Sequence, residues 1–238
     1  MLKFDPIDLL YTLYSIPCIL LALTCHEVAH GWVAYKLGDP TARNFGRLTL
    51  NPLKHLDPIG TLSMIFFGFG WAKAVPVNTR YFKKPKRDMA LTALAGPITN
   101  LILGFIGMLL YVICMSVMFE SPIEYSMIMM KMSTGFVEAT KVEILKASVM
   151  QLLTIFFSMN ISLAVFNLIP LPPLDGSKIL GIVLPTKWYF KFMQYERYVY
   201  LILIVLLVTD VLTTPLLTVV NWIASGMLWI INLIPFLG

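Results

Sequence analysis

Long apolar runs, separated by short charged stretches, constrain this chain more than any other feature. Five of them reach the roughly 20 residues that a helix needs to cross a bilayer, at about 7–36, 89–119, 147–169, 192–212 and 216–237. Only 13% of the residues are charged, against about 25% in a typical soluble domain. This composition excludes a disordered chain and disfavours an ordinary soluble enzyme. We therefore expect an all-α polytopic membrane protein of about five transmembrane helices, with residues 1–238 in a single domain.

The charged residues indicate how the chain is oriented in the membrane. Residues 36–88 hold ten Lys or Arg against three Asp or Glu, and residues 175–197 hold four against two, whereas residues 120–146 hold three against four. Because basic loops stay cytosolic, the first two stretches are predicted to face the cytosol, and the third to lie outside as a loop. We expect a multi-pass protein of the cell membrane. No basic patch interleaved with aromatic residues lies away from these loops, so nucleic-acid binding is not expected.

The basic region between the first two apolar runs has features of its own. Residues 46–51 and 75–79 mix alternating polarity with β-branched residues, which predicts short strands. A small membrane-associated β segment is therefore expected near residues 46–79. Residues 59–71 are apolar but only 13 in number, too few to span a bilayer, so this stretch is expected to be interfacial or re-entrant.

Residues 26–30 read His-Glu-Val-Ala-His inside the first apolar run. Because residues four apart share one face of a helix, His26 and His30 can reach one ion, with Glu27 beside them. Two histidines with a neighbouring glutamate can hold zinc and activate water. His26 precedes Lys36 by ten residues, which places it about 15 Å below the cytosolic end of the helix. The alternative, a helix end with satisfied polar residues, is disfavoured because ionisable groups at membrane depth are costly and usually mark function.

A catalytic zinc usually has three protein ligands, so a third ligand must come from elsewhere in the chain. Asp175 follows a run that ends in three prolines and unwinds, as backbone does where it is buried in protein or lines a wet cavity. The alternative role for Asp175 is an N-cap of the helix that begins at Gly176. His55 is a weaker candidate because it lies in a basic surface loop. With Asp175 as ligand, the charges of zinc and the two carboxylates nearly cancel.

These residues resemble the site-2 protease family of intramembrane zinc metalloproteases (peptidase family M50), in its minimal prokaryotic form without PDZ or CBS domains. The resemblance rests on His-Glu-Val-Ala-His and on Asn-Leu-Ile-Pro-Leu-Pro-Pro-Leu-Asp-Gly at 167–176, and extends to residues 26–51, 70–78 and 93–100. It implies one zinc ion per chain held by His26, His30 and Asp175, with Glu27 as catalytic base. One departure is Ala74, where the family usually has proline.

The same resemblance implies that Asn167 and Asn100 contact substrate or steady the oxyanion. Considered alone, each asparagine is an amide in an apolar run, and an interhelical hydrogen bond is the alternative role. For Asn167, at the point where the run unwinds, substrate contact is favoured. For Asn100 the two roles remain open.

The predicted activity is hydrolysis of peptide bonds in the membrane-spanning segments of other proteins, at a site opening toward the cytosol. Such a segment must unwind locally before it can be cut, and an exposed strand edge near residues 46–51 or 75–79 could then hold it. A metal or proton transporter is an alternative, although it would spread polar residues along several spans. A non-proteolytic zinc-binding membrane protein is another. The sequence leaves the substrate, the trigger and the oligomeric state open.

Overall fold

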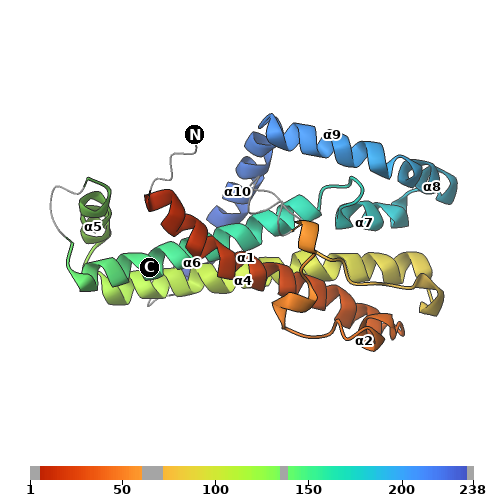
Figure 1. Cartoon of the computed structure of the whole chain (residues 1–238), viewed down its shortest axis with the longest axis horizontal. Coiled ribbons are helices and arrows are strands. Elements are labelled where there is room, and N and C mark those ends of the chain that lie inside the picture. The colour runs from red at the N-terminus through yellow and green to blue at the C-terminus, as the bar shows by residue number, and fades with distance from the viewer. Residues whose placement is uncertain (1–5, 61–71, 135–138, 235–238) are drawn as a thin grey trace.

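The computed structural model describes residues 6–60, 72–134 and 139–234, and nearly all of its regular structure is helical (Figure 1). In chain order the elements are α1 (Pro6–Lys36), α2 (Thr41–Asn44), the 3-10 turns η1 (Pro52–Lys54) and η2 (Thr79–Tyr81), α4 (Pro85–Met118), α5 (Pro122–Thr134), α6 (Lys141–Asn167), α7 (Asp175–Val183), α8 (Thr186–Gln194), α9 (Glu196–Val208) and α10 (Thr213–Asn232). The all-α expectation is confirmed for this part of the chain.

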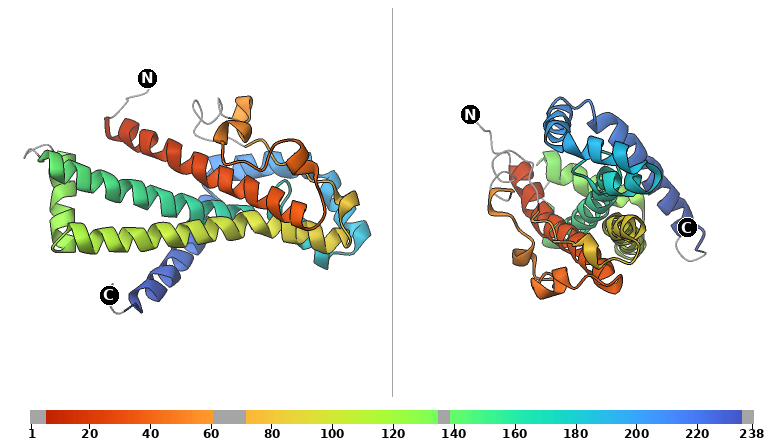
Figure 2. Two further views of the ribbon diagram at one scale, coloured as in Figure 1. Left: turned by 90° about the horizontal axis from the view of Figure 1, so that it is seen from below. Right: turned by 90° about the vertical axis from the view of Figure 1, so that its right-hand side faces the viewer.

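Three long helices form the frame of the molecule. α4 and α6 run side by side, and α1 crosses both (Figures 1 and 2). Glycines allow the close approach of α4 to α6: a Cβ on Gly104 would lie 2.8 Å from Ile161, and one on Gly107 would lie 2.7 Å from Phe156. Real Cβ atoms do not approach other atoms so closely, so a side chain at either position would displace Ile161 or Phe156.

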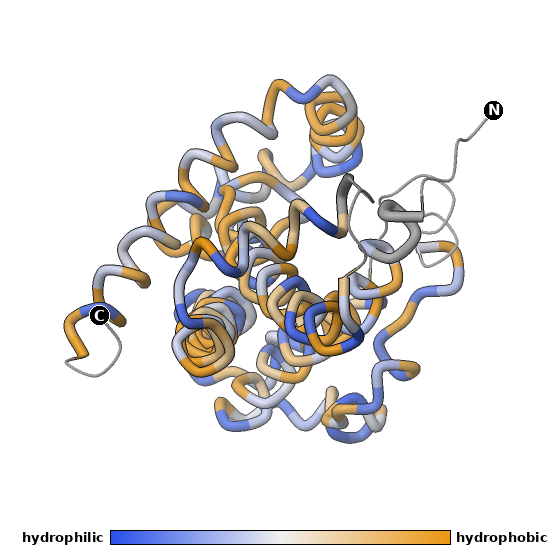
Figure 3. The backbone as a smooth tube through the Cα atoms, turned by 90° about the vertical axis from the view of Figure 1, so that its left-hand side faces the viewer, coloured by the Kyte–Doolittle hydropathy of each residue, from blue (hydrophilic) through white to orange (hydrophobic). Residues whose placement is uncertain are grey.

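Four helices in the described part of the chain are long and apolar enough to cross a membrane, namely residues 11–36 of α1, all of α4 and α6, and α10. Figure 3, which looks along the long axis of the molecule, shows hydrophobic residues on the turns of the helices, interspersed with hydrophilic ones. The expected fifth span, at about 192–212, is not confirmed. α9 has only 13 residues, about 20 Å of helix, against about 30 Å of hydrocarbon.

The helices differ from the expected spans in one further way, although α1 matches its expected span and continues through Pro17. The stretch 120–146, expected to be a loop, contains α5 and the first turn of α6. That turn begins at a capping box, in which Thr140 and Glu143 each accept a hydrogen bond from the other's backbone N–H, and this motif starts a helix earlier than hydropathy alone suggests.

The expected β segment near residues 46–79 is not confirmed. Within the described part of this region, pairing is limited to an isolated antiparallel bridge between Leu56 and Ala72. Two backbone N–H groups that strand pairing would need donate instead to side chains. The N–H of Val75 donates to Glu27 at 2.8 Å, and the N–H of Asn78 donates to Asp39 at 2.7 Å. Residues 72–78 therefore form an extended segment held by side chains. The interfacial stretch expected at 59–71 lies, from residue 61 onward, outside the described residues.

The basic elements gather at one end of the frame. The C-terminal end of α1, the N-terminal end of α4, and helices α7 and α8 lie together there, and α5 lies at the opposite end (Figure 2). The described residues of the two basic stretches, 36–60, 72–88 and 175–197, lie in this half of the molecule (Figure 2). The fold thus brings the two predicted cytosolic regions to the same side.

Candidate metal centre

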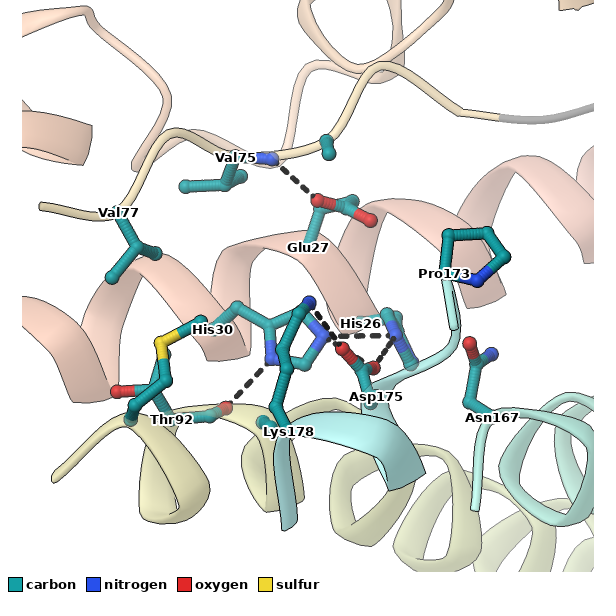
Figure 4. A pocket seen from close by; sticks show the side chains of 13 residues that line it. His26, Glu27, His30, Val75, Val77, Thr92, Asn167, Pro173, Asp175 and Lys178 are labelled. Atoms are coloured by element: carbon teal, nitrogen blue, oxygen red, sulfur yellow. Dashed lines mark hydrogen bonds and ion pairs between the residues drawn. The ribbon is translucent and has the colours of Figure 1, made fainter. Parts of the chain in front are cut away.

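Two histidines of α1 and the first residue of α7 meet where α1 crosses the other helices. Nε2 of His26 lies 3.1 Å from Oδ2 of Asp175, and Nε2 of His30 lies 2.9 Å from the same oxygen (Figure 4). The two Nε2 atoms are 2.9 Å apart. All three residues are buried, with exposed fractions of 4%, 8% and 5%. In the described part of the chain, no other group of three or more His, Cys, Asp or Glu side chains is close enough together to hold a metal ion.

The other ring nitrogens of the two histidines face acceptors. Nδ1 of His30 lies 2.7 Å from the carbonyl of Thr92, and Nδ1 of His26 lies 2.6 Å from Oδ1 of Asn100. With Nδ1 protonated, each neutral imidazole directs the lone pair of Nε2 into the cluster. Two lone pairs and a carboxylate oxygen at these distances repel one another unless a cation stands between them. Two imidazoles and one carboxylate therefore fit zinc in number and in kind.

Asp175 is oriented by its tertiary partners. The residue before it, Leu174, is the N-cap of α7, and its side chain makes no capping bond, so Asp175 does not have the N-cap role considered from the sequence. Its Oδ1 accepts a hydrogen bond from Nζ of Lys178 at 2.9 Å.

Lys178 is a site residue that the sequence reasoning missed. It lies three residues after Asp175 on α7, and helical residues three apart share a face. That spacing was the available signal, but it becomes informative only once Asp175 is known to point into the site.

Glu27 lies beside the cluster on α1 and lines the same pocket (Figure 4). The N–H of Val75, on the extended segment 72–78, donates to Oε2 of Glu27 at 2.8 Å. The remaining pocket lining is mainly small or apolar: Ala74, Val75, Val77, Met89, Thr92, Ala93 and Pro173, together with Asn167 and Lys178. The carboxylate of Glu27, the candidate metal centre and an apolar wall therefore line the same pocket.

The two asparagines singled out from the sequence are placed differently. Asn167 lines the pocket, and its Nδ2 donates to the carbonyl of Leu163 at 2.9 Å. Asn100 is fully buried behind His26, and both of its polar atoms bond within the protein. This favours a positioning role for Asn100 over contact with a substrate.

Gly96 of α4 allows the histidines to pack where they do. A Cβ at this position would lie 2.5 Å from atoms of both His26 and His30. His55, the weaker third-ligand candidate, is not part of the cluster. It is buried elsewhere, and its Nε2 contacts the carbonyl of Thr49 at 2.8 Å.

Comparison with known proteins supplies independent information. The family model of peptidase family M50 matches residues 14–210. YwhC of Bacillus subtilis, named as a candidate zinc metalloprotease, is 42% identical over 210 residues, which cover 88% of this chain and 84% of the relative. Rip2 of Mycolicibacterium smegmatis, similarly named, is 26% identical over 209 residues, which cover 85% of this chain and 70% of the relative. No solved structure matches the chain.

Proposed function

Because the chain belongs to peptidase family M50, we propose that the cluster of His26, His30 and Asp175 holds one catalytic zinc ion and that Glu27 is its general base. The family makes the chain a site-2 protease-like intramembrane metalloprotease, so the proposal concerns which residues do this work. The observation that carries it is the convergence of two Nε2 atoms and one carboxylate oxygen within 3.1 Å of one another.

The side chains around the cluster can be given complementary roles. When bound, zinc supplies a Lewis acid that polarises a peptide carbonyl and makes water easier to deprotonate. Glu27 accepts a proton from the attacking water and delivers it to the leaving amine. The hydrogen bond from Val75 holds the Glu27 carboxylate at the pocket wall, and Lys178 holds the outer oxygen of Asp175.

The two asparagines take different roles in this proposal. The Oδ1 of Asn167 has no partner among the described residues and faces the pocket (Figure 4), so we assign Asn167 to substrate binding. Asn100 is assigned to orienting His26, because its amide is buried and already bonded. The oxyanion role predicted for Asn100 therefore has no support in its contacts, although no comparison tests it.

The substrates we propose are membrane-spanning segments of other proteins. α1, which carries His26, Glu27 and His30, and the helices α4 and α6 that pack against it are apolar enough to cross a bilayer, so the proposal includes lateral entry of a lipid-embedded segment. The backbone of a helical segment is shielded by its own hydrogen bonds, so the segment must first unwind. Holding of that segment along residues 72–78 by strand addition stays a prediction.

We further propose that the protein lies in the cell membrane with its site open to the cytosol. The support is that the described residues of the basic stretches, 36–60, 72–88 and 175–197, lie in the half of the molecule where α7 carries Asp175 (Figure 2). Basic residues flanking spans favour the cytosolic side. The transporter alternative is not favoured, because in the described residues the metal-type ligands gather at one site and form no path across the membrane.

The test compares the full chain with its Glu27→Gln variant. Both are purified in detergent and incubated with single-span substrates that carry Gly, Pro or Asn in the span, and cuts are mapped by mass spectrometry. We expect Glu27→Gln to bind zinc normally and to lose cleavage by about 100-fold or more. A chelator should stop cleavage by the unsubstituted chain, and zinc should restore it.

The matched control is Glu196→Gln, the same change at the start of α9 and outside the pocket lining. This variant should cleave normally. Full activity of Glu27→Gln would exclude Glu27 as the base. A chain that binds zinc but cuts none of the substrates would favour the non-proteolytic alternative.

A further inference from the structure

We propose that Asn160 of α6 is a positioning residue for the metal centre, acting on His26 through Asn100. Asn160 lies outside the pocket lining and is fully buried. Nothing in its sequence context distinguishes it from other polar residues of an apolar helix. The inference rests on the proposed role of His26 as a zinc ligand and adds a residue that does not touch the ion.

The observation behind it is a continuous chain of hydrogen bonds across three helices. Nδ1 of His26 on α1 lies 2.6 Å from Oδ1 of Asn100 on α4. Nδ2 of Asn100 donates to Oδ1 of Asn160 on α6 at 2.9 Å. Nδ2 of Asn160 donates to the backbone carbonyl of Phe156 at 2.9 Å. The chain therefore starts at a backbone group of α6 and ends at an imidazole of the metal centre.

The chemistry at the α6 end determines the direction of every bond. A backbone carbonyl can only accept, so the amide nitrogen of Asn160 must face Phe156. The amide oxygen of Asn160 then faces Asn100 and requires the nitrogen of that side chain. The oxygen of Asn100 is left facing His26, and it can only accept.

This direction decides which ring nitrogen of His26 carries the proton. Nδ1 must donate to Asn100, so the lone pair of a neutral ring is on Nε2, the atom 3.1 Å from Asp175. Hydrogen bonds to the non-ligating nitrogen typically hold the tautomer and the ring orientation of metal-binding histidines. The Asn160 amide thus helps to hold His26 in its ligating form.

A second hydrogen bond of Asn100 limits the loss of zinc affinity expected when Asn160 is replaced. Nδ2 of Asn100 also donates to the carbonyl of Ala22, at 3.2 Å. This acceptor alone favours the same orientation of the Asn100 amide, so loss of Asn160 should weaken the arrangement without abolishing it. Loss of Asn100 removes the partner of His26 itself and should have the larger effect.

A merely structural bond between α4 and α6 is the alternative role for Asn160. It would change the thermal stability of the metal-free protein and leave its intrinsic zinc affinity unaltered. It would also act independently of the bond between Asn100 and His26. Zinc affinity measured in a double-mutant cycle therefore separates the two roles.

The experiment uses the purified full chain in detergent with zinc alone as the probe, in competition with a chromophoric chelator. Asn160→Leu keeps the bulk of the side chain and removes its amide, and Asn160→Ala is measured in parallel because it only deletes atoms. We expect each to weaken zinc binding about three- to tenfold, the range of one net hydrogen bond. In an Asn100→Ala background, already weakened about 10- to 100-fold, neither change should weaken binding further.

Thr154→Ala is the matched control. Thr154 is a partly buried polar residue of the same helix, and its hydroxyl donates to the backbone carbonyl of Met150 at 2.8 Å, outside the chain of amides. This variant should bind zinc as tightly as the unsubstituted chain. Unchanged zinc affinity in both Asn160 variants, or an equal loss with and without Asn100, would overturn the inference. An unsubstituted chain that binds no zinc would instead overturn the proposed metal site.

Discussion

Polar side chains gather at both ends of the α1–α4–α6 frame, and the two gatherings are built differently. At the metal centre, His26, His30 and Asp175 come from two elements and are each at least 92% buried. At the α5 end, Lys131 pairs with Glu143 at 2.7 Å, on side chains that are 35% and 21% exposed. Water screens the second kind of pair, whereas a buried polar group that loses its partner remains unsatisfied.

Apolar packing, rather than charge, holds the α5 end together. Phe119, Ile128, Ala147 and Met150 form a buried cluster between α4, α5 and α6. The metal centre has small residues at its close contacts and polar groups at its core. We therefore expect substitutions at the two ends to have different consequences: those at the centre should change zinc binding, and those at the α5 end should change stability.

The largest effect is expected from Asp175→Ala. This change removes one of the three proposed ligand atoms and leaves Lys178 without its partner. Zinc affinity should fall by more than about 100-fold, beyond the effect of losing a residue that only orients a ligand. Competition with a chelator measures it. Zinc binding that depends on His26 and His30 but not on Asp175 would contradict the proposed ligand set.

Gly96→Ala should have the next largest effect. The added Cβ would meet both imidazoles at 2.5 Å, so the rings must move from their present positions. We expect zinc affinity to fall by about 10- to 100-fold, with cleavage falling in parallel. Gly226→Ala on α10 is the control, because nothing lies within 4 Å of its Cβ, and alanine there should raise helix stability by up to about 1 kcal/mol.

Lys178→Met tests the hydrogen bond that Lys178 donates to Oδ1 of Asp175. The lysine side chain is 32% exposed, so solvent weakens the pair, and zinc affinity should fall by only about two- to fivefold. Lys178→Arg keeps the charge and should retain most of the affinity. If Lys178→Met matched Asp175→Ala, the lysine would have a larger role than the one its geometry supports.

The smallest effect on the centre is expected from changes at the α5 end. Lys131→Met breaks an exposed ion pair and should lower the Tm slightly, with zinc affinity unchanged. Ile128→Ala, in the buried cluster nearby, should destabilise the protein by about 2–5 kcal/mol. Thermal unfolding with and without zinc measures both. A loss of intrinsic zinc affinity in either variant would show that the two ends are coupled.

Local patterns in the sequence predicted much of this protein. Apolar runs identified the four long helices, because burial in lipid requires some 20 apolar residues in succession. The pairing of His26 with His30 followed from helical spacing. The fifth span and the β segment were not confirmed. At residues 72–78, backbone N–H groups that could pair two strands donate instead to the carboxylates of Glu27 and Asp39. The hydropathy pattern does not reveal these hydrogen bonds.

By itself, the sequence determined the membrane class, the face of α1 that carries the two histidines, and Asp175 as a candidate partner. All of these depend on residues close together in the chain. Only the tertiary structure decided that Asp175 turns away from capping α7 and that Gly96 makes room for the rings. It also decided that Asn160 reaches His26 through Asn100. These contacts join residues from 60 to 149 positions apart, and they depend on how the helices cross.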